Sequence, residues 1–93
     1  MSVRYELEYG NRFLKDLKLA KRRGLDLNEL KVVIDMLQED KPLTAKYHDH
    51  ALTGNYKGYR ECHINPDWLL IYNKKETIRV ISLYRTGTHS DLF

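Results

Sequence analysis

The sequence predicts a single α+β domain over residues 1–93, in the order β-α-α-β-β-β, with two antiparallel helices packed on a small sheet. Three observations support this fold class. The first residues alternate apolar and polar side chains, two central segments repeat apolar residues at helical spacing, and three short apolar segments fill the second half. A chain of 93 residues is long enough for one hydrophobic core but not for a second domain.

The first strand is expected over residues 3–9, where apolar and charged side chains alternate with the two-residue period of a half-buried strand. Asn11 is then expected to cap a helix whose apolar residues recur at helical spacing as far as Ala20. Gly24 follows, and it permits the left-handed backbone conformation that closes a helix.

The second helix is expected to begin with a capping box, in which Asp26 accepts from a backbone amide and Glu29 reaches back to the cap. Apolar residues between Leu30 and Leu37 form its buried stripe, and Pro42 ends it. Because so few residues join the two helices, we expect them to lie antiparallel and to cover a common sheet.

Three further strands, separated by turn-like segments, are expected over residues 56–64, 68–73 and 77–84. The segment Trp68–Tyr72 is apolar throughout, as in a central strand that is covered on both faces. Residues 43–55 are expected to be irregular. Cys62 is the only cysteine, which excludes an intrachain disulfide and a zinc site of paired cysteines, and it is expected to be a small buried strand residue.

Positive charge is concentrated near the N-terminus. Seven of the 16 lysines and arginines lie in the first 24 residues beside only three acids, although the net charge of the chain is +3. Such a basic helix attracts phosphate backbones without reading sequence, but a charged helix face is more often merely solvated. The candidate contacts are Arg12, Lys15, Lys18, Lys21, Arg22 and Arg23.

The sequence has no apolar segment of the roughly 18 residues that cross a bilayer, and no hydrophobic stretch of a signal peptide. A cytoplasmic protein without a membrane partner is therefore expected.

Groups that can hold or move a proton, with one fixed cation, gather in the second half of the chain. A tight turn at Asn65 and Pro66 would bring His63 and Asp67 into opposite or diagonal reach. The candidate catalytic residues are His50, His63, Asp67, Arg85 and His89.

This set suits metal-free cleavage of RNA by its own 2′-hydroxyl. The reaction needs a base for the 2′ proton, an acid for the leaving 5′-oxygen and a cation for the charge on phosphorus. Histidine performs both proton transfers near neutral pH, and an adjacent Asp67 can orient one imidazole. Arg85 can hold phosphate oxygens through two parallel hydrogen bonds.

Each of these residues also has a purely structural interpretation. A histidine at a strand end is commonly half-exposed with its hydrogen bond satisfied, and this interpretation is favoured for His48. Arg85 would in that case pair with Asp91 or Asp67. The same side chains could ligate zinc or iron, but their spacing matches no metal signature, so neither a metal nor another cofactor is expected.

Two aromatic residues can be interpreted in two ways. Trp68 is expected in the core, with its indole N–H bonded locally. Phe93, as the last residue, is either frayed or a surface on which a base stacks.

The most specific motifs are His50–Gly54, Gly58–Arg60 with His63, Pro66–Trp68, Leu70–Tyr72, Arg85–His89 and Phe93. With them the whole chain resembles the RelE/ParE superfamily of bacterial toxins and, within it, the YafQ branch. RelE proper relies on lysine, arginine and tyrosine, whereas this chain offers histidines. The resemblance implies a RelE-like fold, with both helices on one face of a mainly antiparallel sheet and the active site on the concave other face.

The resemblance also implies roles for particular residues. Trp68 and Phe93 would contact the substrate, and Asp67 would orient a histidine. His50 or His63 would be the general base and His89 the general acid. Arg85 would stabilise the transition state.

The activity implied is that of a ribosome-dependent mRNA endonuclease, the toxin of a type II toxin-antitoxin system. It would cut mRNA in the 30S A site, leave 2′,3′-cyclic phosphate and 5′-hydroxyl ends, inhibit translation and prefer lysine codons. The basic residues of the first helix would dock on ribosomal RNA. A DinJ-like antitoxin is the implied partner, in a heterotetramer that binds operator DNA.

Two alternatives to a nuclease stay open. A ParE-like toxin binds DNA gyrase without cutting RNA, and a gyrase supercoiling assay would identify it. An interaction module with a decayed site would cause no growth arrest when it is expressed without an antitoxin. A protein that only binds needs no cluster of titrating groups, and this favours the nuclease.

Overall fold

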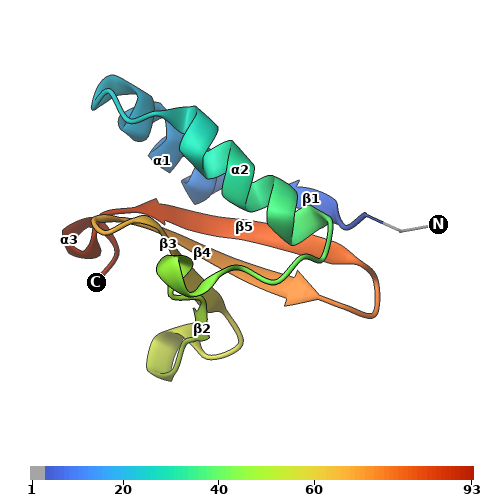
Figure 1. Ribbon diagram of the computed structural model, residues 1–93. Coiled ribbons are helices and arrows are strands. Elements are labelled where there is room, and N and C mark those ends of the chain that lie inside the picture. Colours follow the sequence, from blue (N-terminus) through green and yellow to red (C-terminus); the bar gives the residue numbers. More distant parts are fainter. Residues whose placement is uncertain (1–3) are drawn as a thin grey trace.

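In the computed structural model, which describes residues 4–93, two helices cover one face of a five-stranded sheet (Figure 1). The α+β class and the two antiparallel helices are confirmed. Helix α1 spans Asn11–Arg22 and helix α2 spans Leu27–Gln38. The strands are β1 (Glu6–Tyr9), β2 (His50–Ala51), β3 (Arg60–Asn65), β4 (Trp68–Lys75) and β5 (Val80–Gly87).

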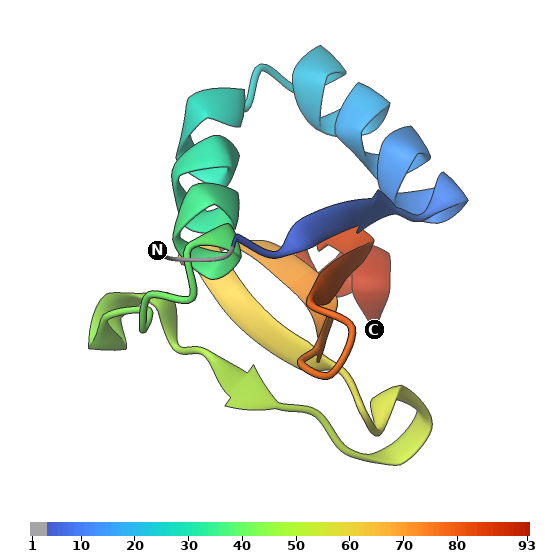
Figure 2. The same ribbon diagram turned by 90° about the vertical axis from the view of Figure 1, so that its right-hand side faces the viewer.

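The strand order is β1-β5-β4-β3-β2, and only β1 and β5 pair in parallel. The mainly antiparallel sheet is therefore confirmed. Figure 2 shows the N-terminal strand beside the last one, beneath the two helices. The expected first strand also included Val3, which lies outside the described residues; β1 itself begins at Glu6.

The N-cap of helix α1 lies one residue earlier than predicted. Gly10, not Asn11, is the N-cap, and no side chain caps the helix. The Gly10 N–H donates to the Leu83 carbonyl at 3.0 Å, so the chain leaves the sheet while its backbone lies against β5. A Cβ at this position would lie 3.0 Å from the same carbonyl oxygen, which explains the glycine. Gly24 has the predicted left-handed conformation, with φ of 78°.

Helix α2 is capped by Asp26, which accepts from the Asn28 N–H at 2.9 Å as predicted. The capping box is wrong, because Glu29 does not reach back and instead accepts from the Asn65 amide at 3.3 Å. The helix also ends at Gln38, well before Pro42. Asp40, with φ of 58°, turns the backbone there.

The core lies between the helices and the sheet. Phe13 and Val33 from the helices meet Leu70 and Tyr72 from β4, and all four are buried. A second apolar cluster on the opposite face contains Leu69, Ile71 and Leu92. Strand β4 is therefore covered on both faces, as its uninterrupted apolar sequence predicted.

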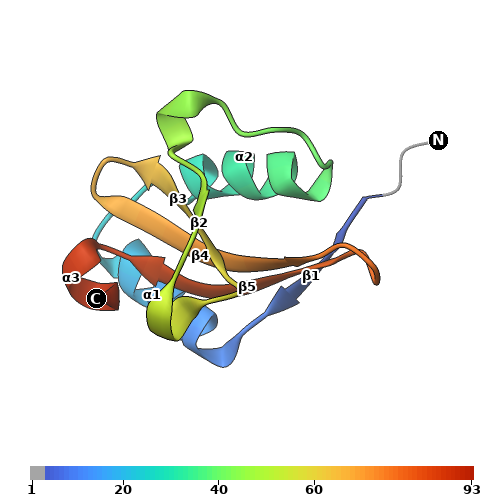
Figure 3. The ribbon, with the colours of Figure 1, turned by 90° about the horizontal axis from the view of Figure 1, so that it is seen from below.

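The segment between α2 and β3 contains more structure than predicted. It forms two 3₁₀ turns, η1 (Ala45–Tyr47) and η2 (Gly54–Tyr56), with β2 between them. The predicted strand over 56–64 begins only at Arg60, because Gly54 and Gly58 have positive φ and turn the chain first. The segment runs from η1, which lies beside α2, along the β2 edge of the sheet to η2, whose Tyr56 packs on the cluster of the opposite face (Figures 1 and 3).

Two other boundaries differ from the predictions. Strand β4 continues to Lys75 and strand β5 begins only at Val80, so the turn between them lies a few residues later than the predicted strands implied. A short helix, α3 (His89–Leu92), was not predicted. Within residues 4–93, no helix has both the length and the apolar character that crossing a membrane requires.

Candidate active site

The candidate site lies on the sheet face opposite the helices. Cys62 and Ile64 of β3 belong to the core on the helix side, so the alternating side chains of Glu61 and His63 point to the other face. Strand β2 pairs His50 directly with Glu61. Helix α3 adds His89 beside them.

A buried carboxylate connects the histidines. Glu61 is 4% exposed, and its Oε1 lies 3.6 Å from Nε2 of both His50 and His63. Potential ligand atoms of Glu61, His63 and His89 all lie within 4.8 Å of one another. Glu61 was not among the predicted residues. The signal that could have identified it is its spacing, because residues two apart on a strand share a face.

The rings of the site form a continuous series. The His63 ring centroid lies 5.1 Å from that of His48 and 5.9 Å from that of His89. His89 lies 6.3 Å from Phe93, which in turn lies 5.4 Å from Tyr56. The structure therefore brings three imidazoles next to an aromatic surface, and the terminal Phe93 belongs to that surface rather than being frayed.

Two further tyrosines extend the aromatic surface and were missed from the sequence. Tyr84 of β5 lies 6.2 Å from Tyr56 and stacks on Tyr59 at 4.8 Å. The Tyr56 hydroxyl donates to the Leu92 carbonyl at 3.2 Å, which ties η2 to α3. Bases of single-stranded RNA stack on such rings.

The hydrogen bonding of His50 fixes its tautomer. Its Nδ1 lies 2.7 Å from the His48 carbonyl oxygen, and because a carbonyl only accepts, Nδ1 carries the hydrogen. Nε2 is then the atom that faces Glu61. His48 presents its carbonyl from a left-handed conformation, with φ of 48°.

Asp49 anchors the loop that carries His48 and His50. It accepts from the Tyr72 hydroxyl at 2.6 Å and from the Arg60 guanidinium at 3.2 and 3.4 Å. Burial, reinforced by Asp49, raises the pKa of Tyr72, and the hydrogen bond to Asp49 raises the pKa of Arg60. The loop is thus tied to β3 and β4 by an ion pair and a neutral phenol.

Arg85 is held by helix α1. Its Nε and Nη2 donate to Asp16 at 2.7 and 3.3 Å, and the Thr86 N–H donates to the same carboxylate at 3.0 Å. The Asp16 carboxylate raises the pKa of Arg85. The pairing with Asp91 or Asp67 that the sequence suggested is wrong. Arg85 lies near Tyr56 and Tyr84, and within residues 4–93 its guanidinium forms no ion pair or hydrogen bond with a histidine.

Asp67 does not occupy its predicted position. His63 pairs with Leu69 and Asn65 with Trp68, so Asp67 lies in the turn and not opposite His63. Its N–H donates to the Asn65 side chain at 3.1 Å, and its side chain is exposed. Throughout residues 4–93 the Asp67 carboxylate has no hydrogen bond or ion pair with a histidine. Glu61 makes those contacts instead.

Trp68 is 1% exposed and lies in the core on the helix side, as its structural interpretation predicted. Its Nε1 donates to the Thr86 hydroxyl at 2.8 Å. The implied contact of Trp68 with substrate is therefore wrong, because the ring is on the far side of the sheet. Phe93 is 61% exposed and is open to a ligand.

A clamp on Asp91 holds α3, and with it His89. Asp91 and Thr88 form a reciprocal capping box at 2.9 and 3.2 Å, and Arg23 donates to both Asp91 oxygens at 2.7 and 3.3 Å. A Cβ on Gly87 would lie 2.9 Å from an Asp91 oxygen. Gly87 is therefore needed for this close approach.

We expect this clamp to weaken in acid. Arg23 and the Thr88 N–H hold the pKa of the Asp91 carboxyl well below its usual range. The stabilisation is therefore complete above the unfolded value of about 3.9 and is lost as the pH falls toward the folded value. Asp91→Asn should lower the free energy of unfolding by about 1 kcal/mol at pH 7. In thermal unfolding from pH 7 to 3, its deficit in Tm should shrink below about pH 4; a constant deficit would contradict this.

The predicted docking residues of α1 differ in their contacts. Arg23 is bound to Asp91. The other side chains are exposed and form no ion pair with any residue in 4–93; they are Arg12, Lys15, Lys18, Lys21 and Arg22.

Comparison with known proteins gives consistent matches. Residues 5–93 match the family model of YafQ, the bacterial toxin of type II toxin-antitoxin systems. The mRNA interferase toxin YafQ of Escherichia coli K12 is 45% identical over 92 residues, which are 98% of each chain.

Two solved structures are similar to this one. The first is the E. coli DinJ-YafQ toxin-antitoxin complex, with 42% identity, a TM-score of 0.88 and coverage of 98% of this chain and 99% of that one. The second is a metal-bound toxin from Helicobacter pylori, with 43% identity, a TM-score of 0.89 and coverage of 96% and 99%.

Proposed function

The chain belongs to the YafQ family of bacterial toxins of type II toxin-antitoxin systems, and we propose that it is an mRNA interferase, an endoribonuclease that cuts messenger RNA. The observation that carries the proposal is the buried Glu61 carboxylate between the imidazoles of His50 and His63, with His89 beside them. A site that only bound a protein partner would not need this set of proton-transfer groups.

The cut is made in the cytoplasm, on mRNA held in the ribosomal A site. A domain of 93 residues is small beside a long RNA, so the ribosome supplies the position of the substrate. The attacking 2′-oxygen is already attached next to the phosphorus, and the protein therefore has to supply only proton transfers and charge stabilisation.

The chemistry proceeds by attack of the 2′-oxygen on phosphorus. His50 or His63 removes the 2′ proton through Nε2 as the P–O bond forms. His89 gives a proton to the departing 5′-oxygen as its bond to phosphorus breaks. The products carry a 2′,3′-cyclic phosphate and a 5′-hydroxyl, and no water is consumed in this step.

Two charged groups support these proton transfers. Glu61 takes the orienting role that the sequence assigned to Asp67, because it stabilises a protonated imidazole at 3.6 Å. Arg85 neutralises charge on the phosphate oxygens. Asp16 holds two of its nitrogens, and Nη1 is the nitrogen without a hydrogen bond to the described chain.

The proposal is tested by adding purified protein to ribosomes programmed with a defined mRNA and mapping the cut by primer extension. Cleavage within the A-site codon, absent for the same mRNA without ribosomes, is the expected result. Inhibition of gyrase supercoiling without any cleavage would instead identify a ParE-like binding toxin.

We expect transition-metal ions to inhibit the enzyme. Glu61, His63 and His89 present ligand atoms close enough to share one ion, and a similar toxin from H. pylori has been solved with bound metal. An ion there would occupy the nitrogen atoms that transfer protons. Micromolar Zn²⁺ should lower the cleavage rate about tenfold or more, and a chelator that leaves the ribosomal Mg²⁺ bound should restore it. Stimulation by Zn²⁺, or loss of basal activity with that chelator, would contradict the mechanism.

Helix α1 is proposed to dock on ribosomal RNA through its unpaired cations. Reversing the charge of Lys15, Lys18 and Arg22 should weaken ribosome binding about tenfold and reduce its dependence on salt, because each phosphate contact adds to the salt slope. Lys57→Glu reverses one exposed lysine at the C-cap of η2 and is the control for a charge reversal outside α1, to be compared with the single variant Lys18→Glu. Ribosome binding is measured by sedimentation. If the variant binds ribosomes with the wild-type affinity, these cations do not contact ribosomal RNA and serve only solubility.

A DinJ-like antitoxin is proposed as the cognate partner, because a YafQ protein of similar fold has been solved in complex with DinJ. The complex is a heterotetramer that binds operator DNA. Coexpression of the antitoxin encoded with this toxin should abolish growth arrest, and the purified complex should shift an operator fragment in a gel.

A further inference from the structure

The segment that carries His50 directs its side chains to two faces of the sheet. His50 pairs with Glu61 across β2 and β3 and therefore lies on the face of the candidate active site. The ring of His48 lies on that face as well, 5.1 Å from the ring of His63. Asp49, between the two histidines, points to the helix side. The segment thus presents imidazoles to the site and a carboxylate to the other face.

Asp49 holds this segment from the helix side of the sheet. It accepts from the hydroxyl of Tyr72, a residue of the helix-side core, at 2.6 Å, and from two nitrogens of Arg60 at 3.2 and 3.4 Å. Within residues 4–93 these are the only side-chain hydrogen bonds that join residues 48–51 to β3 or β4. The Asp49 side chain is only 23% exposed, so water competes weakly for these bonds.

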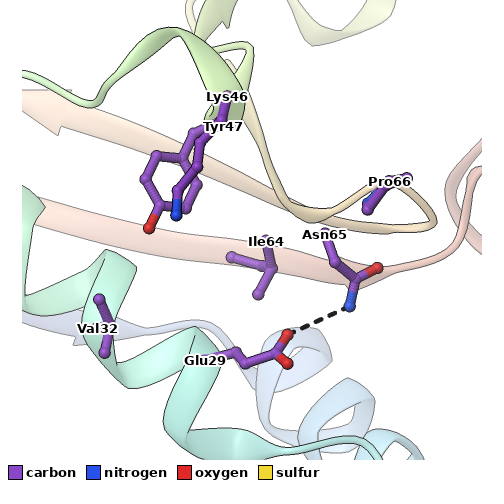
Figure 4. A pocket seen from close by; sticks show the side chains of 7 residues that line it. All are labelled: Glu29, Val32, Lys46, Tyr47, Ile64, Asn65 and Pro66. Atoms are coloured by element: carbon purple, nitrogen blue, oxygen red, sulfur yellow. Dashed lines mark hydrogen bonds between the residues drawn. The ribbon is translucent and has the colours of Figure 1, made fainter.

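Apolar packing holds the same segment only loosely. Tyr47 of η1 is half-buried against the core, yet a pocket of about 540 Å³ opens between η1 and α2. Figure 4 shows Tyr47 on one side of this pocket and Glu29 and Val32 of α2 on the other. Strand β2 is two residues long, and both of its residues are exposed. The hydrogen bonds of Asp49 therefore determine the position of the segment more than its apolar contacts do.

The backbone next to Asp49 has an unfavourable conformation. His48 has φ of 48°, in the left-handed region that costs free energy for a residue other than glycine. Such a conformation persists only where the surrounding structure holds it. In this conformation the His48 carbonyl oxygen lies 2.7 Å from Nδ1 of His50. Releasing Asp49 would allow His48 to relax and would break that hydrogen bond.

The hydrogen on Nδ1 leaves Nε2 of His50 as the atom that can accept a proton. A free histidine side chain prefers the opposite tautomer, in which Nε2 carries the hydrogen and has no lone pair for a 2′ proton. In the structure Nε2 lies 3.6 Å from Glu61, whose carboxylate stabilises a proton that Nε2 has taken up. The His50 side chain is 50% exposed, so a 2′-hydroxyl can reach it.

We propose that Asp49 is a positioning residue, which holds His50 in the tautomer and the place in which its Nε2 serves as the general base. Asp49 acts through the backbone of His48 and touches neither the substrate nor the reacting atoms. The inference rests on the proposed cleavage of mRNA and deepens it, because it selects His50 over His63 as the residue that takes the 2′ proton.

The tautomer of His50 is measured by long-range proton–nitrogen NMR correlations of isotope-labelled histidine, at about pH 8.5, where an ordinary imidazole is neutral. A His50→Gln variant identifies its signals. Wild type should carry the His50 hydrogen on Nδ1. Asp49→Ala should move about half of the molecules or more to the form with the hydrogen on Nε2. Asp49→Asn should stay close to wild type, because its amide oxygen still accepts from Tyr72 and Arg60.

The same variants are compared in cleavage kinetics on programmed ribosomes. Asp49→Ala should lower kcat about tenfold or more and leave KM unchanged, because a misplaced base slows the chemistry without weakening ribosome docking. Asp49→Asn should lose less than about threefold. Glu8→Ala is the matched control at the other edge of the sheet, since Glu8 also accepts from a hydroxyl and a cation, those of Ser82 at 2.6 Å and Lys75 at 3.5 Å. It should keep the wild-type tautomer and kcat.

An unchanged His50 tautomer in folded Asp49→Ala, or an unchanged kcat, would overturn the inference and leave the proposed function standing. If Asp49→Ala does not fold, Tyr72→Phe takes its place, since it removes one of the three hydrogen bonds and keeps the buried ring. Tyr72→Phe should shift the tautomer in the same direction and lower kcat about threefold; if neither changes, the role is rejected. If wild type cuts none of the programmed mRNAs, the proposed function fails, and the tautomer alone decides whether Asp49 positions His50.

Discussion

His89→Ala should lower the rate of ribosome-dependent cleavage by about 10²- to 10⁴-fold. In the proposed mechanism this imidazole protonates the departing 5′-oxygen, and no other histidine of the cluster is placed on α3. The side chain is exposed, so its removal leaves no buried cavity, and the Asp91 clamp keeps the helix in place. Single-turnover kinetics on programmed ribosomes measure the chemical step.

The controls for His89 separate chemistry from folding. Ser90→Ala changes the next exposed residue of the same helix and should retain wild-type activity. The thermal unfolding midpoint of His89→Ala should stay close to that of wild type. A fully active His89→Ala variant would remove this residue from the mechanism.

Glu61→Gln is the second substitution with a large expected effect, a loss of about 10²-fold in cleavage rate. Glutamine keeps the shape of the side chain but cannot stabilise a protonated His50 or His63 at 3.6 Å. A Glu61→Gln variant that unfolds at the wild-type temperature and cleaves at the wild-type rate would contradict this role.

Asp67→Asn is the matched control for Glu61. It removes a carboxylate from the turn directly after β3, where no histidine is bonded to it. If Asp67→Asn lost activity while Glu61→Gln did not, the sequence-based assignment of Asp67 would be restored.

The fold could be predicted where one periodicity dominates a long segment. The helical stripes ending at Ala20 and Leu37 and the uninterrupted apolar Trp68–Tyr72 all have the structure they predicted. Short elements could not be predicted. Strand β2 is only two residues long, and α3 depends on the Thr88 capping box and on Arg23, which is 68 residues away from Asp91 in sequence.

The histidines of the candidate site could be predicted from the sequence, but its carboxylate, Glu61, could not. His50, His63 and His89 converge as the motif indicated, whereas Asp67 was chosen by its closeness to the turn. The register of the hairpin pairs Asn65 with Trp68 and shifts between His63 and Asn65, which no sequence period reveals. The register therefore decides between the two carboxylates.

The partner of Arg85 could not be predicted from the sequence either. A register shift in β5 between the partners of Ile71 and Tyr72 changes which way its side chains point. Beyond Tyr9 the strand β1 has ended, and α1 supplies Asp16 as the partner of Arg85. The Arg85–Asp16 ion pair depends on where helix α1 and the edge of the sheet meet in space. The acidic residues nearest to Arg85 in sequence therefore do not identify its partner.

The most direct test of the central claim is the chemistry of the cut ends. RNA cleaved on the ribosome by the wild-type protein should carry a 2′,3′-cyclic phosphate on the upstream fragment and a 5′-hydroxyl on the downstream one, both identified by mass spectrometry. A 3′-hydroxyl with a 5′-phosphate would contradict attack by the 2′-oxygen and the roles given to the three histidines.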